Sequence, residues 1–308
     1  MRPNAIVFAY HDVGDRCLRT LLSAGWDVRL VVTHRPDPAE TQWFADVAST
    51  AADYSIPVLR PRAPGAPDVE RLVEELRPDF IFSFYYRWML SEKLLGCARR
   101  GALNMHGSLL PRYRGRAPVN WAILSGETWT GATLHHMVAK ADCGDIVDQL
   151  AVPILEDDTA ADVMKKVVAA AEIVLARSLP GLADGVAART PQDLSQGEYR
   201  GRRSPEDGRI DWAWPAIRIH NLVRAVVPPF PGAFGTIAGE RWDILGTRLL
   251  KERLQPAHRP LLFEDHGECR IRCGDGGVLR LLAAMKDGVA VDLRELARQL
   301  AASPLPLA

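Results

Sequence analysis

The sequence is poor in the features that mark several common classes of protein. It contains 5 cysteines, and no two of them form a Cys-x-x-Cys pair. An odd number of scattered cysteines does not fit a disulfide framework, so we interpret them as free thiols in a reducing compartment. Lys and Arg together number 38, as do Asp and Glu, so no net charge attracts a polyanion such as tRNA or DNA. We therefore expect no nucleic-acid partner, although local basic clusters can still occur.

Long apolar runs and nucleotide-binding glycine motifs are also absent. No run approaches the roughly 18 apolar residues that a membrane-spanning helix needs, and the first one, Ala5–Tyr10, lacks the length and flanks of a signal peptide. We therefore expect a cytoplasmic protein without membrane insertion. Tyr10-His11-Asp12-Val13-Gly14 follows that run in place of Gly-x-Gly-x-x-Gly, and there is no Walker-type loop. The sequence therefore lacks the glycine motif that would be the main evidence for binding a dinucleotide.

Apolar runs alternate with helical patterns from the N-terminus onward, which is typical of βαβ units and a sheet covered on both faces. The predicted strands are Ala5–Tyr10, Trp26–Thr33, Ile56–Leu59, Phe80–Tyr85, Ala102–His106 and Ala132–Met137. The predicted helices are Asp15–Ala24, Thr41–Asp53, Val69–Leu76, Val119–Leu124 and Ala160–Leu179. This order predicts an α/β fold with a doubly wound parallel sheet. In such sheets ligands bind beyond the carboxyl ends of the strands, where we place His106 and the loop Val138–Gly144.

The C-terminal part of the chain has a different pattern. A polar linker at Ala183–Glu206 leads to a predicted helix at Ile217–Val226, and short alternating segments follow. Between Cys269 and Cys273 apolar residues alternate with arginines, as in a strand with one buried face. The chain length fits about two domains. We place them at residues 1–203 and 204–308, the second being a small β-barrel.

The stretch Leu103–Asp142 carries the residues best suited to chemistry. On a strand, the period of two puts Asn104 and His106 on one face. A side-chain amide can stabilise an oxyanion, by about 3–4 kcal/mol in acyl-transfer sites, and an imidazole can move a proton near neutral pH. A single histidine beside apolar residues is more often a structural group. Here it follows a strand, shares a face with an amide and precedes Gly107, which would let a ligand approach the backbone.

Asp142 and an arginine-rich loop complete this candidate site. Asp142 is by default a turn residue, and the alternative is that its loop folds back and holds the carboxylate against His106, favouring the imidazolium form. The loop Pro111–Pro118 contains two prolines and a glycine, so it cannot form a regular helix or a central strand. Its three arginines, Arg112, Arg114 and Arg116, are either a solvated face or a site for carboxylate or phosphate groups.

Several motifs resemble the 10-formyltetrahydrofolate-dependent formyltransferases. They are Asn104-Met105-His106-Gly107-Ser108-Leu109-Leu110-Pro111-Arg112-Tyr113-Arg114-Gly115, Gly131-Ala132-Thr133-Leu134, Ala141-Asp142-Cys143-Gly144-Asp145-Ile146-Val147, Gly208–Trp212, Ile219–Ala225 and Pro229–Phe234. The resemblance covers nearly the whole chain. It implies a Rossmann-like catalytic domain followed by an OB-like β-barrel domain. It also implies transfer of a formyl group from 10-formyltetrahydrofolate to an amine, without a metal.

Within the family, three segments resemble the branch that formylates UDP-4-amino-4-deoxy-L-arabinose, a step of lipid A modification and polymyxin resistance. They are Val7–Asp12, Phe82–Arg87 and Arg114–Trp121. Methionyl-tRNA formyltransferases instead typically show Gly-Thr-Pro after the first strand and an alanine where Arg116 stands. Methionyl-tRNA or a dTDP-linked amino sugar as acceptor, or a folate- or nucleotide-binding module without chemistry, are the alternatives. Members of this branch also carry a decarboxylase half, so we expect either a stand-alone relative or an excised domain of a bifunctional enzyme. The expected partners are a second copy of the chain or the missing decarboxylase domain.

The resemblance further implies roles for individual residues. Asn104 would stabilise the oxyanion, His106 would transfer a proton, and Asp142 would favour the charged form of His106. The folate would be bordered by Trp88, Met89, Leu90, Arg116, Val138, Ala139, Lys140, Ala141 and Asp142. Trp88 could equally be a core residue. The candidates for contacts with the nucleotide sugar are Arg202, Arg203, Asn221, Arg224, Pro231 and Gly232, which could instead lock the two domains together.

Overall fold

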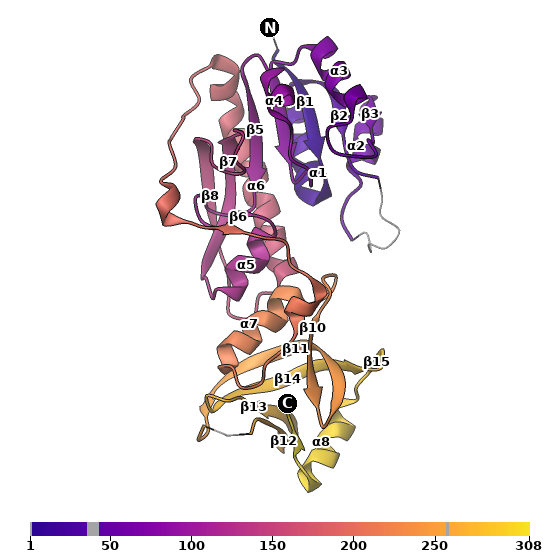
Figure 1. Ribbon diagram of the computed structural model, residues 1–308, viewed down its shortest axis with the longest axis vertical. Coiled ribbons are helices and arrows are strands. Elements are labelled where there is room, and N and C mark those ends of the chain that lie inside the picture. The colour runs from indigo at the N-terminus through magenta and orange to yellow at the C-terminus, as the bar shows by residue number, and fades with distance from the viewer. Residues whose placement is uncertain (1, 36–42, 257–258) are drawn as a thin grey trace. The chain divides into compact units, whose positions relative to one another are not determined.

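The computed structural model describes residues 2–35, 43–256 and 259–308, and the chain divides into two compact units (Figure 1). Unit 1 comprises Met1–Pro118, Trp129–Pro153 and Met164–Gly201, and unit 2 comprises Val119–Thr128, Ile154–Val163 and Arg202–Ala308. The domain boundary at residues 203 and 204 stays a prediction. Within the described ranges, no helix has the length and apolar character needed to cross a membrane.

A seven-stranded sheet with the order β3-β2-β1-β4-β5-β7-β8 forms the centre of unit 1. The strands are β1 (Asn4–Ala9), β2 (Asp27–Val32), β3 (Val58–Leu59), β4 (Phe80–Phe84), β5 (Gly101–His106), β7 (Trp129–His136) and β8 (Ile146–Pro153). The predicted Rossmann-like fold is confirmed. Strands β3, β2, β1, β4 and β5 run parallel, whereas β7 runs antiparallel to both β5 and β8. The loop between β7 and β8 is too short for the crossover that parallel neighbours require.

Helices cover both faces of this sheet (Figure 1). They are α1 (His11–Ser23), α2 (Val47–Asp53), α3 (Pro67–Leu76), α4 (Glu92–Gly96) and the part of α6 (Ala160–Asp184) that belongs to unit 1. Helix α1 packs on β1 and β4, and an ion pair of 2.6 Å between Arg16 and Glu172 joins it to α6. On the opposite face, Val69 and Val73 of α3 pack into an apolar cluster with Ile6, Phe8 and Ile81.

Helices α1, α2 and α6 differ most from the bounds that the pattern predicts. Helix α1 begins at His11 rather than Asp15, because Gly14 lets the first turn approach β1: a Cβ there would lie 3.1 Å from Ala9. Helix α2 begins only at Val47, because the Asp46 side chain accepts the N–H of Ala48 and caps the helix there. The predicted residues Thr41 and Gln42 lie outside the described ranges. Helix α6 continues past Leu179 to Asp184.

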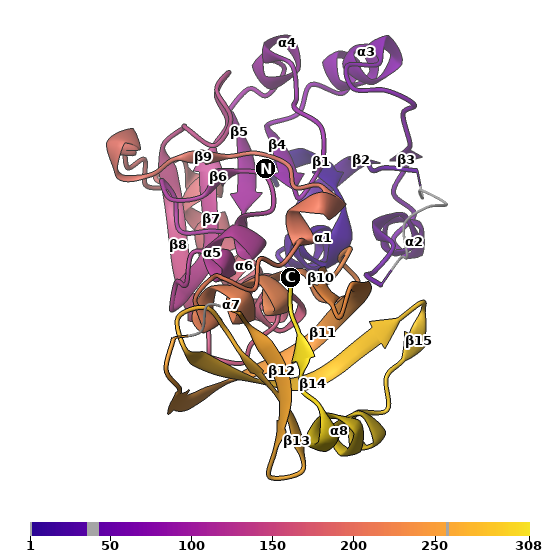
Figure 2. The same cartoon turned by 60° about the horizontal axis from the view of Figure 1, so that its bottom comes forward.

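Unit 2 is built on an antiparallel sheet with the order β10-β11-β14-β13-β12-β16, to which β15 adds beside β14 (Figure 2). The strands are β10 (Ala233–Ile237), β11 (Glu240–Arg253), β12 (Leu261–Asp265), β13 (Glu268–Arg272), β14 (Gly277–Lys286), β15 (Val289–Ala290) and β16 (Leu305–Pro306). The sheet curls until a bridge between Ile237 and Leu307 joins its two edges. Helices α5 (Pro118–Leu124), α7 (Ala216–Val226) and α8 (Leu293–Ala302) complete the helical elements. The predicted small barrel is confirmed.

The linker between α6 and α7 has structure of its own. Strand β9 (Tyr199–Arg200) pairs in parallel with β6 (Arg114–Gly115), and Thr190 bridges to Ile146 at the start of β8. Short 3-10 turns occupy Leu194–Gln196 and Pro205–Gly208. The linker therefore lies against the loops that carry the predicted site residues.

Candidate active site

Strand β5 delivers Asn104 and His106 to the same face of the sheet. Both side chains approach the carboxylate of Asp142: the amide Nδ2 of Asn104 lies 3.5 Å from Oδ1, and the ring Nδ1 of His106 lies 3.7 Å from Oδ2. Leu103 and Met105 are buried on the opposite face. The structure therefore brings together the three residues that the sequence assigns to chemistry.

The loop that carries Asp142 arrives from an unexpected direction. Because β7 is antiparallel to β5, this loop leaves the sheet at the amino end of β5, where Met137 donates its N–H to Ala102, and not beside His106 as expected. It then folds back across the face of the sheet. Asp142 adopts a left-handed conformation with φ of 54°, which Asp tolerates better than most residues. The Gln192 side chain donates to the carbonyls of Asp142 and Gly144 and holds the loop in place.

Asp142 is a largely buried anion that its neighbours keep charged. Burial alone would raise the pKa of its carboxyl group, but the nearby rings of His106 and His135 and the N–H of Gly115 outweigh this effect and hold that pKa well below its ordinary value of 3.8. Gly115 donates to Oδ2 at 2.8 Å, and Nε2 of His135 lies 3.5 Å from Oδ1. The carboxylate thus remains ionised throughout the physiological pH range.

His106 is oriented by the loop that follows it. Its Nε2 lies 2.9 Å from the carbonyl oxygen of Tyr113, and because a carbonyl only accepts, this nitrogen carries the hydrogen. The loop is tied to β7 by Thr133, whose hydroxyl donates to the carbonyl of Ser108 and accepts the N–H of Leu110. The ring therefore has a fixed direction, with Nδ1 toward Asp142.

The sequence interpretation did not include His135. This residue lies directly opposite Asn104 in the β5–β7 register, and its Nε2 is 3.1 Å from the Asn104 amide nitrogen. Its Nδ1 lies 2.9 Å from the carbonyl of His136. Period-two alternation alone would have assigned His135 and His136 to opposite faces of β7. Only the pairing with β5 shows which of the two rings reaches the site.

Gly107 makes room for a side chain of the protein, and not for a ligand as expected. The space beside its Cα, which the sequence suggests for a ligand, holds the hydroxyl of Tyr85, because a Cβ at Gly107 would lie 1.8 Å from that oxygen. Tyr85 follows β4 with a left-handed φ of 58°. Its buried hydroxyl has no hydrogen-bond partner within the described residues, and burial raises its pKa. The close approach of Tyr85 therefore requires glycine after His106.

The three arginines of the loop after β5 have separate surroundings. Arg114 is buried, and its guanidinium donates to the carbonyls of Gly197 and Leu194. The proposed capture of a ligand by Arg114 is therefore corrected: this arginine holds the linker on the loop. Arg112 and Arg116 are exposed, and Arg116 donates to the carbonyl of Arg87.

The residues predicted to border the folate lie on two segments of unit 1. Trp88 is half-buried, with its ring edge-on to His34 at 4.7 Å, and Met89 is exposed. Leu90 and Met137 pack on the same apolar cluster, so the segment Trp88–Leu90 and the start of the Val138–Asp142 loop border one region. Val138, Ala139 and Lys140 are exposed, and Ala141 is half-buried. Exposed Met and Val side chains offer apolar surface to a ligand.

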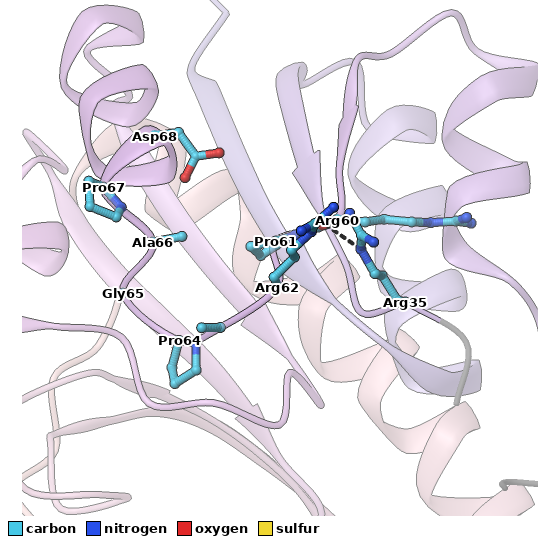
Figure 3. A pocket seen from close by; sticks show the side chains of 10 residues that line it. Arg35, Arg60, Pro61, Arg62, Pro64, Gly65, Ala66, Pro67 and Asp68 are labelled. Atoms are coloured by element: carbon cyan, nitrogen blue, oxygen red, sulfur yellow. Dashed lines mark hydrogen bonds between the residues drawn. The ribbon is translucent and has the colours of Figure 1, made fainter. Parts of the chain in front are cut away.

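A cavity of about 410 Å³ lies at the carboxyl ends of β2 and β3 and is lined by Arg35, Arg60, Arg62 and the segment up to Asp68 (Figure 3). Arg35 donates to the carbonyl of Arg60, and Arg60 pairs with Asp46 at 3.1 Å. Arg62 is exposed and forms no ion pair within the described part of the chain. Pro61 and Ala66 also line a small second cavity that includes Trp88 and Leu90. The first cavity, which we call the arginine pocket after Arg35, Arg60 and Arg62, is suited to carboxylate or phosphate groups.

The candidates for the nucleotide sugar lie in unit 2, where three of them have structural partners. Arg203 donates to the carbonyl of Asp207 at 2.8 Å. Arg224 is buried and donates to Asn221 at 2.9 Å and to the carbonyl of Asp158 at 3.0 Å. These contacts hold α7 on the segment before α6, so we remove Asn221 and Arg224 from the substrate candidates. The guanidinium of Arg203 lies 5.0 Å from the Trp121 ring.

The other three candidates of unit 2 lie at its surface or in a turn. Arg202 and Pro231 are exposed, and Gly232 is a buried turn residue with φ of 89°. Within the residues that the structure describes, no cluster of three or more His, Cys, Asp or Glu is arranged to hold a metal ion.

Comparison with known families agrees with this geometry. A model of the formyl transferase family matches residues 4–179, and a model of the formyl transferase C-terminal domain matches residues 202–300. This chain belongs to the formyl transferase family. It is an enzyme of the one-carbon, formyl-transferring type.

Solved structures of low sequence identity share the fold of this formyl transferase. One is an N-formyltransferase from Helicobacter canadensis in complex with folinic acid and dTDP-3-aminofucose, with 20% identity, a TM-score of 0.73, and coverage of 91% of this chain and 99% of that chain. A second is HypX from Aquifex aeolicus with tetrahydrofolic acid, with 18% identity, a TM-score of 0.63, and coverage of 93% and 45%. A third is a 4-N formyltransferase from Francisella tularensis, with 19% identity, a TM-score of 0.60, and coverage of 75% and 91%.

We expect Gly107→Ala to destabilise this formyl transferase by about 1–3 kcal/mol, because the added methyl group would overlap the Tyr85 hydroxyl and displace either that ring or His106. Urea unfolding of both proteins measures the difference. Gly96→Ala is the matched control, since nothing lies within 4 Å of the position that its added methyl group would occupy. Equal stability of Gly107→Ala and wild type would show that Tyr85 does not depend on this glycine.

We expect Asp142→Asn to lower the free energy of unfolding by about 1.5–3 kcal/mol at pH 6, because it removes charge-assisted contacts with two rings. The folded-state pKa of Asp142 lies below the ordinary 3.8, so its stabilisation is complete above about pH 5 and declines as the pH falls below 3.8. Urea titrations from pH 3 to 7 should therefore show the two proteins converging at acid pH. Asp287→Asn, at an exposed turn with a similar positive φ, should show no such trend. A difference that is constant across this range would contradict the linkage.

Proposed function

We propose that this enzyme transfers the formyl group of 10-formyltetrahydrofolate to the amine of a nucleotide-linked amino sugar, with UDP-4-amino-4-deoxy-L-arabinose as the first acceptor to test. The observation that carries the proposal is the convergence of an amide, an imidazole and an ionised carboxylate on one face of β5 and β7. The reaction needs a donor to an oxyanion and a group that moves a proton, and these side chains can supply both.

The chemistry follows from these groups. The free amine of the acceptor attacks the formyl carbon, and the carbonyl oxygen becomes the oxyanion of a tetrahedral intermediate. The bond from that carbon to N10 of the folate then breaks, which gives a formamide and tetrahydrofolate. The proton lost by the amine must reach N10. Asn104 stabilises the oxyanion, His106 carries the proton, and Asp142 holds His106 in place.

His106 can act on the substrate only after its Nε2 hydrogen bond changes partner. Its Nε2 hydrogen is directed at the carbonyl of Tyr113, and its Nδ1 faces Asp142. Contact with the amine or N10 therefore requires that the substrate replace Tyr113 as the partner of Nε2. Tyr113 lies in a loop with a left-handed φ of 57°, beside Arg114, whose contacts hold the linker.

Two lines of support favour a nucleotide sugar as the acceptor. The segments Val7–Asp12, Phe82–Arg87 and Arg114–Trp121 resemble the UDP-4-amino-4-deoxy-L-arabinose branch, and the structures of similar fold include an N-formyltransferase in complex with dTDP-3-aminofucose. The balanced charge of the chain offers nothing to attract tRNA. The exposed Arg202, the neighbouring Arg203 and Pro231 remain the proposed contacts for the nucleotide. A role in lipid A modification and polymyxin resistance would follow from this acceptor.

The folate is proposed to lie along Trp88–Leu90, Arg116 and the Val138–Asp142 loop. Arg116 reaches the carbonyl of Arg87, next to Trp88, so an exposed cation and a half-buried indole border the same surface. The structures of similar fold include complexes with folinic acid and with tetrahydrofolic acid. The arginine pocket shares lining residues with the cavity at Trp88 and Leu90, and the folate carries carboxylates at one end.

We expect formyl transfer by the purified wild type and large losses in the site variants. Asn104→Ala should lower kcat by about 10²–10³-fold through the lost oxyanion donor, and His106→Ala by about 10²–10⁴-fold through the lost proton transfer. The rate is measured from the change in absorbance as tetrahydrofolate is released. His266→Asn is the matched control, because this histidine lies on an exposed turn of unit 2.

Competition among acceptors in the same assay tests the choice of substrate. UDP-4-amino-4-deoxy-L-arabinose, a dTDP-linked amino sugar and methionyl-tRNA are offered together with 10-formyltetrahydrofolate. Faster formylation of methionyl-tRNA than of either nucleotide sugar would overturn the proposed acceptor. Wild-type rates in folded Asn104→Ala and His106→Ala proteins would overturn the proposed mechanism.

We expect Arg62→Ala to raise the KM for 10-formyltetrahydrofolate by about 2–5-fold and to leave kcat unchanged, because an exposed arginine contributes a modest, screened attraction to a carboxylate. The effect should shrink as salt is added. Arg71→Ala, an exposed arginine on α3 outside the pocket lining, is the matched control. An unchanged KM for the folate would remove the arginine pocket from the folate site.

A further inference from the structure

The ring of His135 lies where it can decide the orientation of the Asn104 amide. It is almost completely buried on β7, directly opposite Asn104. Its Nδ1 lies 2.9 Å from the carbonyl of His136, which only accepts, so Nδ1 carries a hydrogen. Its Nε2 lies 3.1 Å from the Asn104 nitrogen and 3.5 Å from Oδ1 of Asp142. Two features of this arrangement can still vary: whether Nε2 carries a hydrogen, and which way the Asn104 amide is turned.

A neutral His135 would leave Asn104 unable to stabilise an oxyanion. Its Nε2 would then accept one hydrogen from the Asn104 amide, and the second amide hydrogen would face Asp142 at 3.5 Å. Both hydrogens would be used inside the protein, and only the amide oxygen would remain for the substrate. An oxyanion needs a donor, and an amide oxygen is not one. The lone pair of Nε2 would also face a carboxylate.

A protonated His135 reverses this arrangement. Its Nε2 hydrogen can be donated to Asp142 and to the amide oxygen of Asn104, once the amide is turned by 180°. That turn exchanges an oxygen and a nitrogen of nearly equal size and position. The NH₂ group of Asn104 then faces away from His135 and is available to the substrate. The contact with Asp142 becomes charge-assisted, which is stronger than a neutral hydrogen bond.

We propose that His135, protonated and held by Asp142, is the positioning residue that turns the Asn104 amide so that its NH₂ group faces the formyl oxygen. The inference deepens the proposed formyl transfer and rests on it for the identity of that oxyanion. The titratable groups facing His135 are Asp142, directly, and His106 through Asp142. The side chains of Asn104, His135 and Asp142 thus act as one unit, and His106 lies beside it with its Nδ1 3.7 Å from the carboxylate of Asp142.

Nitrogen NMR of the ¹⁵N-labelled wild-type protein tests the proposal without any substrate. Imidazole nitrogen shifts distinguish a protonated from a bare Nε2, and a scalar coupling between two nitrogens appears only where an N–H donates to the other nitrogen. We expect both His135 nitrogens to carry hydrogens, with no coupling between Nε2 and the Asn104 amide nitrogen. A bare Nε2, or a measurable coupling, overturns the proposal.

Two variants test the consequence for turnover. His135→Leu removes the donor and should lower kcat about 100-fold, with KM values for both substrates within about twofold of wild type. His135→Gln restores an uncharged donor and should recover kcat to within about tenfold. His136→Gln is the matched control, because that ring faces the backbone of Gly101 on the other side of β7, and it should keep the wild-type kcat.

The two experiments separate this inference from the proposed function. A wild-type protein that formylates no acceptor refutes the proposed function, while the NMR result still decides the state of His135. A folded His135→Leu protein with the kcat of wild type overturns the positioning role, whatever the NMR result. Equal losses in His135→Leu and His135→Gln would likewise overturn it, because they would point to packing rather than to a donor.

Discussion

The site depends on one buried anion, the carboxylate of Asp142. Removing a carboxylate from water is costly unless charges and hydrogen bonds replace the lost hydration. Here the replacement comes from the rings of His106 and His135 and the N–H of Gly115, which belong to β5, β7 and the loop after β5. Each of these elements must be in place for the anion to be tolerated. The geometry of the site is thus a consequence of the complete fold of unit 1, and not of a local motif.

The antiparallel direction of β7 allows these side chains to meet around Asp142. Its pairing with β5 sets His135 opposite Asn104, and its direction sends the following loop to the far end of β5. The loop must then cross the face of the sheet to reach β8, and Asp142 lies on that crossing path. A parallel neighbour would have placed its following loop beside His106. The direction of β7 is therefore what brings the carboxylate above the two side chains of β5.

Much of this arrangement follows from local sequence, and the rest depends on contacts between distant segments. The alternation of strands and helices and the shared face of Asn104 and His106 can be predicted from residue spacing. The return of Asp142 is one of two alternatives that the spacing allows, and the resemblance to the family selects it. His135 cannot be predicted in this way, because its role depends on the register of two strands. Arg114 illustrates the same limit: a charge in a Gly- and Pro-broken loop suggests a ligand, but its partners are carbonyls of a linker far along the chain. Asn221 and Arg224 also look like ligand-binding residues in the sequence, but Arg224 donates to Asn221 and to the carbonyl of Asp158, on a separate segment.

The chemistry of the site and the choice of acceptor have different origins in the structure. A formyl carbon attacked by an amine needs an oxyanion donor and a path for one proton, whatever molecule carries the amine. In the proposed mechanism the group around Asp142 meets that need, and it contains nothing that distinguishes a sugar from a methionyl residue. Discrimination must come from contacts made by the remainder of the acceptor, such as an anion with the exposed Arg202. The residues proposed for the reaction therefore follow from the motifs of the family, whereas those proposed for the acceptor, such as the exposed Arg202, must be tested one by one.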